Sequence, residues 1–168
     1  MSNRRNTLLG LGILSGLAAG VRGLFASGPA EAAQPTRSYE LTRTDAEWRK
    51  LLSNEQYQVL RRAGTERPYS SPLDKEKRAG VFNCAGCGLP LFSSSTKFNS
   101  GTGWPSFWQP LDKAVDEKVD SSLGMRRVEV LCRRCGSHLG HVFDDGPKPT
   151  GLRYCMNGVA LTFTSQKT

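Results

Sequence analysis

The 168-residue sequence lacks the features of several protein classes. No apolar run reaches the roughly 18 residues of a membrane-spanning helix, so a convincing membrane span is excluded. No five like charges occur in succession, and the densest basic spots are only pairs: Arg4-Arg5, Arg61-Arg62, Arg126-Arg127 and Arg133-Arg134. The net charge of +8 therefore indicates a solvated basic surface, with a polyanion site as the alternative. No whole-domain repeat is present.

Hydrophobic residues are scarce, at 38% of the sequence, whereas glycine and proline contribute 18 and 9 residues. This balance favours a loop-rich, β-rich fold over a helix bundle. Charged residues, at 23%, argue against wholesale disorder. The length suffices for one domain with a sizeable core, and for a short appendage.

Residues 1–32 have the composition of a targeting segment. Arg4-Arg5 precedes an uncharged, mostly apolar stretch from Asn6 to Val21, and Ala30-Glu31-Ala32 fits a small-x-small cleavage site. The arginine pair resembles a twin-arginine export signal. We predict a cleaved signal peptide at 1–32, a mature domain at 33–168 and a periplasmic location. An amphipathic or uncleaved membrane anchor is the alternative.

Two short helices are expected near the start of the mature chain. Thr44 to Glu47 and Ser53 to Gln56 both have the spacing of a capping box. The first helix is expected to bury one apolar face, made of Trp48, Leu51 and Leu52. The second should continue until Gly64, and the polar segment 65–78 should form a surface loop.

Short apolar segments alternate with turn residues from Gly80 onward, a pattern typical of short strands. The expected strands are Val81–Asn83, Leu89–Phe92, Phe107–Gln109, Arg126–Leu131, His138–Phe143 and Arg153–Phe163. Several short strands at modest spacing predict a mainly β, antiparallel domain.

Four of the five cysteines form two C-x-x-C turns, each followed by glycine: Cys84, Cys87, Cys132 and Cys135. Two such turns supply four thiolates, the tetrahedral ligand set that structural zinc prefers. The 44-residue gap between the turns predicts that the ion ties together distant parts of a larger sheet. Two disulfides or a redox dithiol are the alternatives, which an oxidising compartment would favour.

Cys155 has no such partner. In a strand, Arg153, Cys155 and Asn157 would share one face, because side chains alternate between faces. A cation near the thiol lowers its pKa and raises the thiolate fraction. The alternative is a buried, inert cysteine.

Two other segments carry unusual side chains. Gly101 to Trp108 places two tryptophans on a glycine-rich turn, as a core plug or as a wall of a ligand site. Ser137 to Phe143 contains both histidines, His138 and His141. A regular strand would place them on opposite faces, but a bulge at Gly140 would change this. Either histidine alone is more often structural than catalytic.

Four segments, in this order, resemble the B-type methionine sulfoxide reductases: Gly103–Phe107, His138–Phe143, Asp145–Pro147 and Arg153–Asn157. The two C-x-x-C turns match the zinc-containing members. The resemblance covers about residues 38–163. It implies two small antiparallel sheets with short N-terminal helices, stapled by one structural Zn²⁺, and reduction of the R-epimer of methionine sulfoxide in proteins.

The resemblance also implies residue roles. Cys155 matches the nucleophile, which becomes a sulfenic acid, and Trp104 matches the ring that receives the substrate methyl group. The polar residues matched around the sulfoxide are His138, His141, Arg153 and Asn157. Of these we expect His141 to donate the proton with help from His138, because an imidazole titrates near neutrality. Arg153 and Asn157 are expected to hold the polar oxygen.

Thr102 stands where some members of this family have a resolving cysteine. Because the other cysteines are assigned to the metal, an external thioredoxin-like dithiol is expected to reduce the sulfenic acid. Neither nucleic acid nor, after signal cleavage, a membrane is an expected partner. One rival hypothesis is a non-catalytic, zinc-stabilised scaffold of the same fold. A nucleic-acid-binding zinc module is another, which leaves the signal peptide and the strand from Arg153 to Asn157 unexplained.

Overall fold

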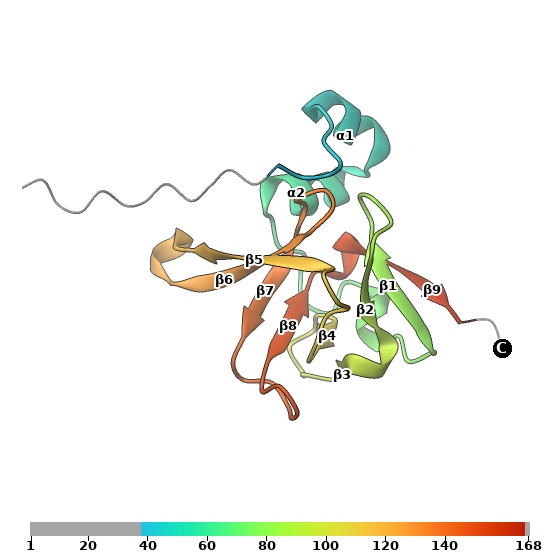
Figure 1. Cartoon of the computed structure of the whole chain (residues 1–168), viewed down its shortest axis with the longest axis vertical. Coiled ribbons are helices and arrows are strands. Elements are labelled where there is room, and N and C mark those ends of the chain that lie inside the picture. The colour runs from blue at the N-terminus through green and yellow to red at the C-terminus, as the bar shows by residue number, and fades with distance from the viewer. Residues whose placement is uncertain (1–37, 167–168) are drawn as a thin grey trace, which may run out of the picture. The chain divides into compact units, whose positions relative to one another are not determined.

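The computed structural model describes residues 38–166, so the predicted signal peptide at 1–32 lies outside the described residues. The described chain consists of two short helices followed by nine strands in two antiparallel sheets (Figure 1). This confirms the mainly β fold with N-terminal helices. Within residues 38–166, none of the helices is long and apolar enough to cross a membrane.

Both helices begin at the predicted capping boxes. Helix α1 spans Asp45–Leu51 and α2 spans Asn54–Arg62, with Thr44 and Ser53 as their caps. Trp48 is buried, but the expectation for Leu51 is wrong, since its side chain is 57% exposed. Helix α1 ends at Leu51, and the following residue turns inward in an extended conformation.

The smaller sheet has three strands in the order β2-β1-β9: Pro90–Ser93, Gly80–Cys84 and Leu161–Ser165. The larger sheet has six strands in the order β3-β4-β8-β7-β6-β5: Lys97–Phe98, Ser106–Phe107, Arg153–Met156, His138–Phe143, Arg127–Cys132 and Val115–Asp120. Strand β5 was not predicted, because four of its six residues are charged.

The expected single strand Arg153–Phe163 is wrong. Strand β8 ends at Met156, a 3₁₀ turn spans Gly158–Ala160, and β9 then joins the other sheet. At the break, the Asn157 side chain is buried and hydrogen-bonded to the Glu66 N–H and the Leu139 carbonyl, and the Asn157 backbone N–H also donates to the Leu139 carbonyl. The nucleophile candidate therefore lies two residues before a crossover between sheets.

Aromatic rings fill the space between the sheets. Phe107 of β4 contacts Phe82 of β1 with ring centroids 4.9 Å apart, and it stacks on Phe92 of β2 at 4.4 Å. All three side chains are fully buried. Such pairs stabilise a core beyond the area that they bury, so they fix the two sheets against each other.

Candidate active site and metal centre

The four paired cysteines meet where the two sheets adjoin. Their sulfur atoms all lie within 4.8 Å of one another. The Cys84 and Cys135 sulfurs are 3.8 Å apart, and the Cys87 and Cys132 sulfurs are 3.5 Å apart. A tetrahedral ion bound to thiolates at about 2.3 Å, as zinc is, separates them by about 3.8 Å, whereas a disulfide needs about 2.05 Å. The donors therefore fit a four-thiolate metal site.

This centre joins different sheets, which corrects the expectation of one larger sheet. Cys84 ends β1 of the three-stranded sheet, and Cys132 ends β6 of the six-stranded sheet. The sheets form separate ladders because the crossover at Asn157 divides the C-terminal strand.

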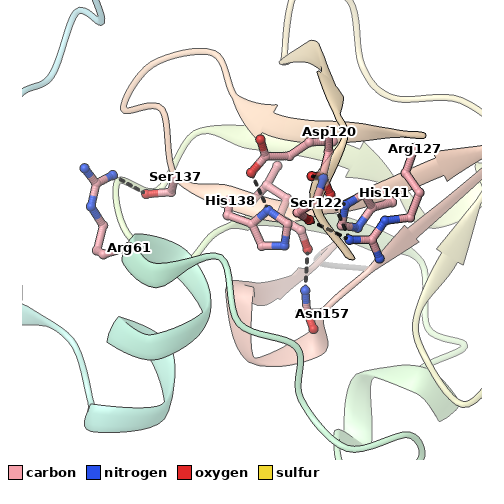
Figure 2. A network of polar contacts seen from close by, with 10 residues as sticks. Arg61, Asp120, Ser122, Arg127, Ser137, His138, His141 and Asn157 are labelled. Atoms are coloured by element: carbon pink, nitrogen blue, oxygen red, sulfur yellow. Dashed lines mark hydrogen bonds and ion pairs between the residues drawn. The ribbon is translucent and has the colours of Figure 1, made fainter. Parts of the chain in front are cut away.

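Helix α2 contacts the metal centre through Arg61, which the sequence analysis treated only as a basic surface residue. Its guanidinium donates to the Cys135 carbonyl at 3.2 Å. It also donates to the Ser137 hydroxyl at 3.3 Å (Figure 2). The Ser137 hydroxyl in turn lies 3.2 Å from the Cys135 sulfur. The N-terminal helices are thus attached to the cysteine turn.

The second site is a cavity of about 150 Å³ beside Cys155. Its lining residues are Thr65, Trp104, Arg127, Gly140, His141, Phe143, Cys155 and Asn157. Four of the six predicted pocket residues meet there. Arg153 and His138 are not among the lining residues, although each contacts a neighbouring element.

Strand pairing places the nucleophile candidate. Cys155 on β8 lies directly opposite His141 on β7 and opposite Ser106 on β4. Directly opposed residues project their side chains to the same face, with Cβ atoms about 4.5–5.5 Å apart. Gly140 permits this approach, because an added Cβ would lie 2.1 Å from the Cys155 carbonyl oxygen.

A β-bulge brings the two histidines together, as the sequence analysis allowed for. The β6–β7 register shifts between Val130, which pairs with Gly140, and Leu131, which pairs with His138. One β7 residue therefore has no partner on β6, and the ring centroids of His138 and His141 are 5.4 Å apart (Figure 2).

His141 is held by the hairpin that β5 and β6 form. Its Nε2 lies 2.9 Å from Oδ2 of Asp120, which also accepts from Arg127 at 2.8 Å. Burial lowers the pKa of His141, and the Asp120 hydrogen bond opposes that shift. Hydrogen bonds from Ser122, His141 and Arg127 hold the pKa of Asp120 well below its ordinary value. The imidazole is therefore largely neutral near pH 7 and paired with a carboxylate.

His138 is more deeply buried, at 4% exposed. Its Nδ1 lies 2.7 Å from Oε1 of Glu129 on β6. Its Nε2 is buried and has no hydrogen-bond partner within residues 38–166. One ring nitrogen of His138 is thus held by a carboxylate, and the other is available to a further polar atom.

The thiol of Cys155 does not have the depressed pKa that the sequence analysis expected. Burial raises the pKa of Cys155, and the Arg153 charge and the Thr102 hydroxyl, 4.0 Å from the sulfur, offset this only partly. Arg153 is also engaged elsewhere, since it donates to both oxygens of Asp145 at 2.9 Å. The sequence revealed the cation, but not the burial or the competing carboxylate.

Asn157 is committed to backbone. Its Nδ2 donates to the Leu139 carbonyl at 3.1 Å, and its Oδ1 accepts from the Glu66 N–H at 2.9 Å. The Trp104 indole N–H donates to the Glu66 carbonyl at 3.2 Å. Asn157 and Trp104 therefore line the cavity while being anchored to the same residue.

Several residues that line the cavity were not predicted from the sequence. Phe143 lies within the motif that was singled out, and its ring sits 4.5 Å beneath the Arg153 guanidinium. Thr65 and Arg127 carried no signal, because one lies in the polar loop and the other in an arginine pair assigned to the surface. Their place in the cavity is set by long-range packing.

A thiol beside a histidine and a tryptophan, in a small cavity on a β domain with a four-cysteine centre, defines the class of thiol-dependent enzymes. The SelR domain family matches residues 52–165. The chain belongs to this family.

Curated relatives are similar over most of their length. A protein of Leptospira interrogans, named peptide methionine sulfoxide reductase MsrB, is 53% identical over 130 residues, which are 77% of this chain and 99% of the relative. Proteins of the same name from Methanosarcina barkeri and Pseudomonas putida are 56% and 57% identical. These alignments cover 74% of this chain in both cases, and 89% and 94% of the relatives.

Proposed function

We propose that this protein reduces the R-epimer of methionine sulfoxide in oxidised proteins to methionine, as a peptide-methionine (R)-S-oxide reductase. The observation that carries the proposal is the direct pairing of Cys155 with His141 in a cavity walled by Trp104. The Trp104 face suits a methyl group beside sulfur, because sulfur–aromatic contacts are favourable.

The reaction moves one oxygen atom and two electrons. The Cys155 sulfur attacks the sulfoxide, the substrate oxygen receives a proton, and the oxygen passes to the cysteine. The products are methionine and a Cys155 sulfenic acid. The sulfoxide is reduced by two electrons as the thiol is oxidised by two.

His141 is suited to handle the proton. A neutral imidazole can accept the proton of the Cys155 thiol and return it to the substrate oxygen. Asp120 stabilises the imidazolium formed in between, since its carboxylate stays ionised. Arg153 stabilises the Cys155 thiolate. His138 assists through its Nε2, which has no hydrogen-bond partner among residues 38–166.

Regeneration requires an external thiol. The sulfenic acid condenses with one thiol of a thioredoxin-like dithiol and releases water, and the second thiol then frees Cys155 as the partner disulfide forms. Thr102 occupies the position where a resolving cysteine would act. The four other cysteines bind one structural Zn²⁺, which joins the two sheets and takes no part in the chemistry.

Export by the twin-arginine route to the periplasm is part of the proposal. It rests on the sequence of residues 1–32. That route carries folded proteins, so zinc can be loaded in the reducing cytosol before export. The reductant would then be a periplasmic dithiol protein. N-terminal sequencing of the exported protein tests this, and a start at Met1 would contradict it.

Turnover of the two separated methionine sulfoxide epimers with a chemical dithiol tests the function. We expect the R-epimer alone to be reduced, and Cys155→Ser to abolish reduction with folding unchanged. If the protein is instead a non-catalytic scaffold, the unmodified protein will reduce neither epimer.

A further inference from the structure

Glu66 is a buried carboxylate that the proposed reaction does not use. It is 5% exposed, and its two oxygens accept separate backbone hydrogen bonds, from Gly158 at 2.6 Å and Val159 at 2.8 Å. These N–H groups begin the 3₁₀ turn that follows the nucleophile's strand. The cap residue of this turn, Asn157, makes no side-chain cap bond, so Glu66 supplies the acceptors instead.

The backbone of Glu66 makes two contacts with residues that line the cavity. Its N–H donates to Asn157 at 2.9 Å, and its carbonyl accepts from the Trp104 indole at 3.2 Å. Three residues later, the Tyr69 N–H donates to the Gly103 carbonyl at 2.7 Å, which holds the same tryptophan loop. One residue thus joins the Trp104 loop to the segment that follows Cys155.

The glycine at position 158 allows Glu66 to approach the backbone of the turn. An added Cβ at Gly158 would lie 2.1 Å from the Ser71 hydroxyl and 3.2 Å from a Glu66 oxygen, so only glycine admits both neighbours. Burial raises the pKa of Glu66, and the two N–H donors oppose that shift. The Glu66 carboxylate is buried, and two backbone donors on a glycine turn satisfy it, so this contact is a specific part of the fold.

The geometry points to Glu66 as the positioning residue that holds the Trp104 ring in register with the Cys155 sulfur. This role deepens the proposed function and rests on it. Both carboxylate oxygens are needed, because the two donors come from successive backbone groups. Glutamine would offer one oxygen and turn its NH₂ toward the other donor, and aspartate is shorter by one methylene.

The test compares Glu66→Gln with the unmodified protein, whose turnover of the R-epimer is measured first. If the unmodified protein is inactive, the proposed function fails, and the fluorescence measurement below still decides the contact. We expect kcat/KM to fall roughly 10- to 100-fold, because small misplacements of reacting groups have effects of this size. Glu66 and the exposed Glu55 both line a second groove, of about 530 Å³, away from the cavity beside Cys155. Glu55→Gln removes a charge from this groove and should leave kcat/KM unchanged.

A double-mutant cycle separates positioning from general destabilisation. If Glu66 acts through the ring, Trp104→Phe costs much less activity in the Glu66→Gln background than in the unmodified protein. The Trp104 fluorescence, taken as the difference between each protein and its Trp104→Phe partner, should also become more accessible to acrylamide in Glu66→Gln. Additive effects with an unchanged Trp104 signal would overturn the proposal.

Folding is checked by circular dichroism and by zinc content. If Glu66→Gln does not fold, Glu66→Asp replaces it, since it keeps the charge and shortens the reach. A folded Glu66→Asp protein with normal kcat/KM would contradict the proposal. So would unfolding of both variants, because Glu66 would then serve global stability and not the site.

Discussion

His141 and Cys155 lie directly opposite each other on β7 and β8, so an imidazole and a thiol share one face of the sheet, with Cβ atoms about 4.5–5.5 Å apart. Burial raises the pKa of Cys155 and lowers the pKa of His141, which keeps both neutral near pH 7. The pair is thus ready to exchange one proton when a sulfoxide arrives.

The first prediction concerns the ionisation of Cys155. The rate of alkylation by iodoacetamide should rise with pH and reach half its maximum above the ordinary thiol value of 9.0. Arg153→Met should move this profile to higher pH, because the Arg153 charge lowers the pKa of Cys155. Asp145→Asn should move it the other way, because the Asp145 charge raises that pKa. Identical profiles for the two variants would refute the assignment.

The second prediction concerns the Asp120 carboxylate. Its hydrogen bond raises the pKa of His141 against burial, so Asp120→Asn should lower that pKa. The limb of the kcat/KM profile that belongs to His141 should then shift to lower pH. We expect kcat/KM at its optimum to fall about 10-fold or more, as for other partners that orient an imidazole. Asp112→Asn, an exposed control, should leave the profile in place.

The third prediction concerns the metal centre. The purified protein should contain one zinc ion per chain, and chelation or Cys132→Ser should abolish cooperative unfolding. A structural zinc contributes an apparent free energy on the order of 10 kcal/mol, comparable with the stability of a whole domain. Cys155→Ser should keep both the zinc and the melting temperature. A metal-free protein with normal thermal unfolding would contradict the assignment.

The fourth prediction concerns Thr102, whose hydroxyl lies 4.0 Å from the Cys155 sulfur. After one turnover without reductant, non-reducing mass spectrometry should find one added oxygen on Cys155 and no internal disulfide. Thr102→Cys should instead trap a disulfide between residues 102 and 155, because the two side chains already face each other. A disulfide from Cys155 to a metal-centre cysteine in the unmodified protein would disprove the single-thiol scheme.

Local patterns were enough to predict much of the fold. The capping boxes at Thr44 and Ser53 act within one helical turn, and the two C-x-x-C turns are complete in four residues. The division of the last strand could not be predicted. At the break, Asn157 contacts Glu66, which lies 91 residues earlier in the chain, and no local pattern indicates such a long-range contact.

The site shows the same division between local and long-range causes. The motif around His138 and His141 predicted the possible bulge, since Gly140 is visible in the sequence. The direction of the Cys155 pKa shift was not predictable, because burial depends on packing. The burial of Glu66 was not predicted either, because Glu66 lies in a polar segment that was expected to form a surface loop.

The protonated state of Cys155 has a consequence for the lifetime of the protein. Peroxide attacks thiolates, so a sulfur that stays protonated between turnovers is oxidised slowly by peroxide itself. Oxygen then reaches Cys155 mainly from the sulfoxide that fills the cavity. A repair catalyst shielded in this way avoids progressing to the irreversible sulfinic acid under the oxidative stress that creates its substrates.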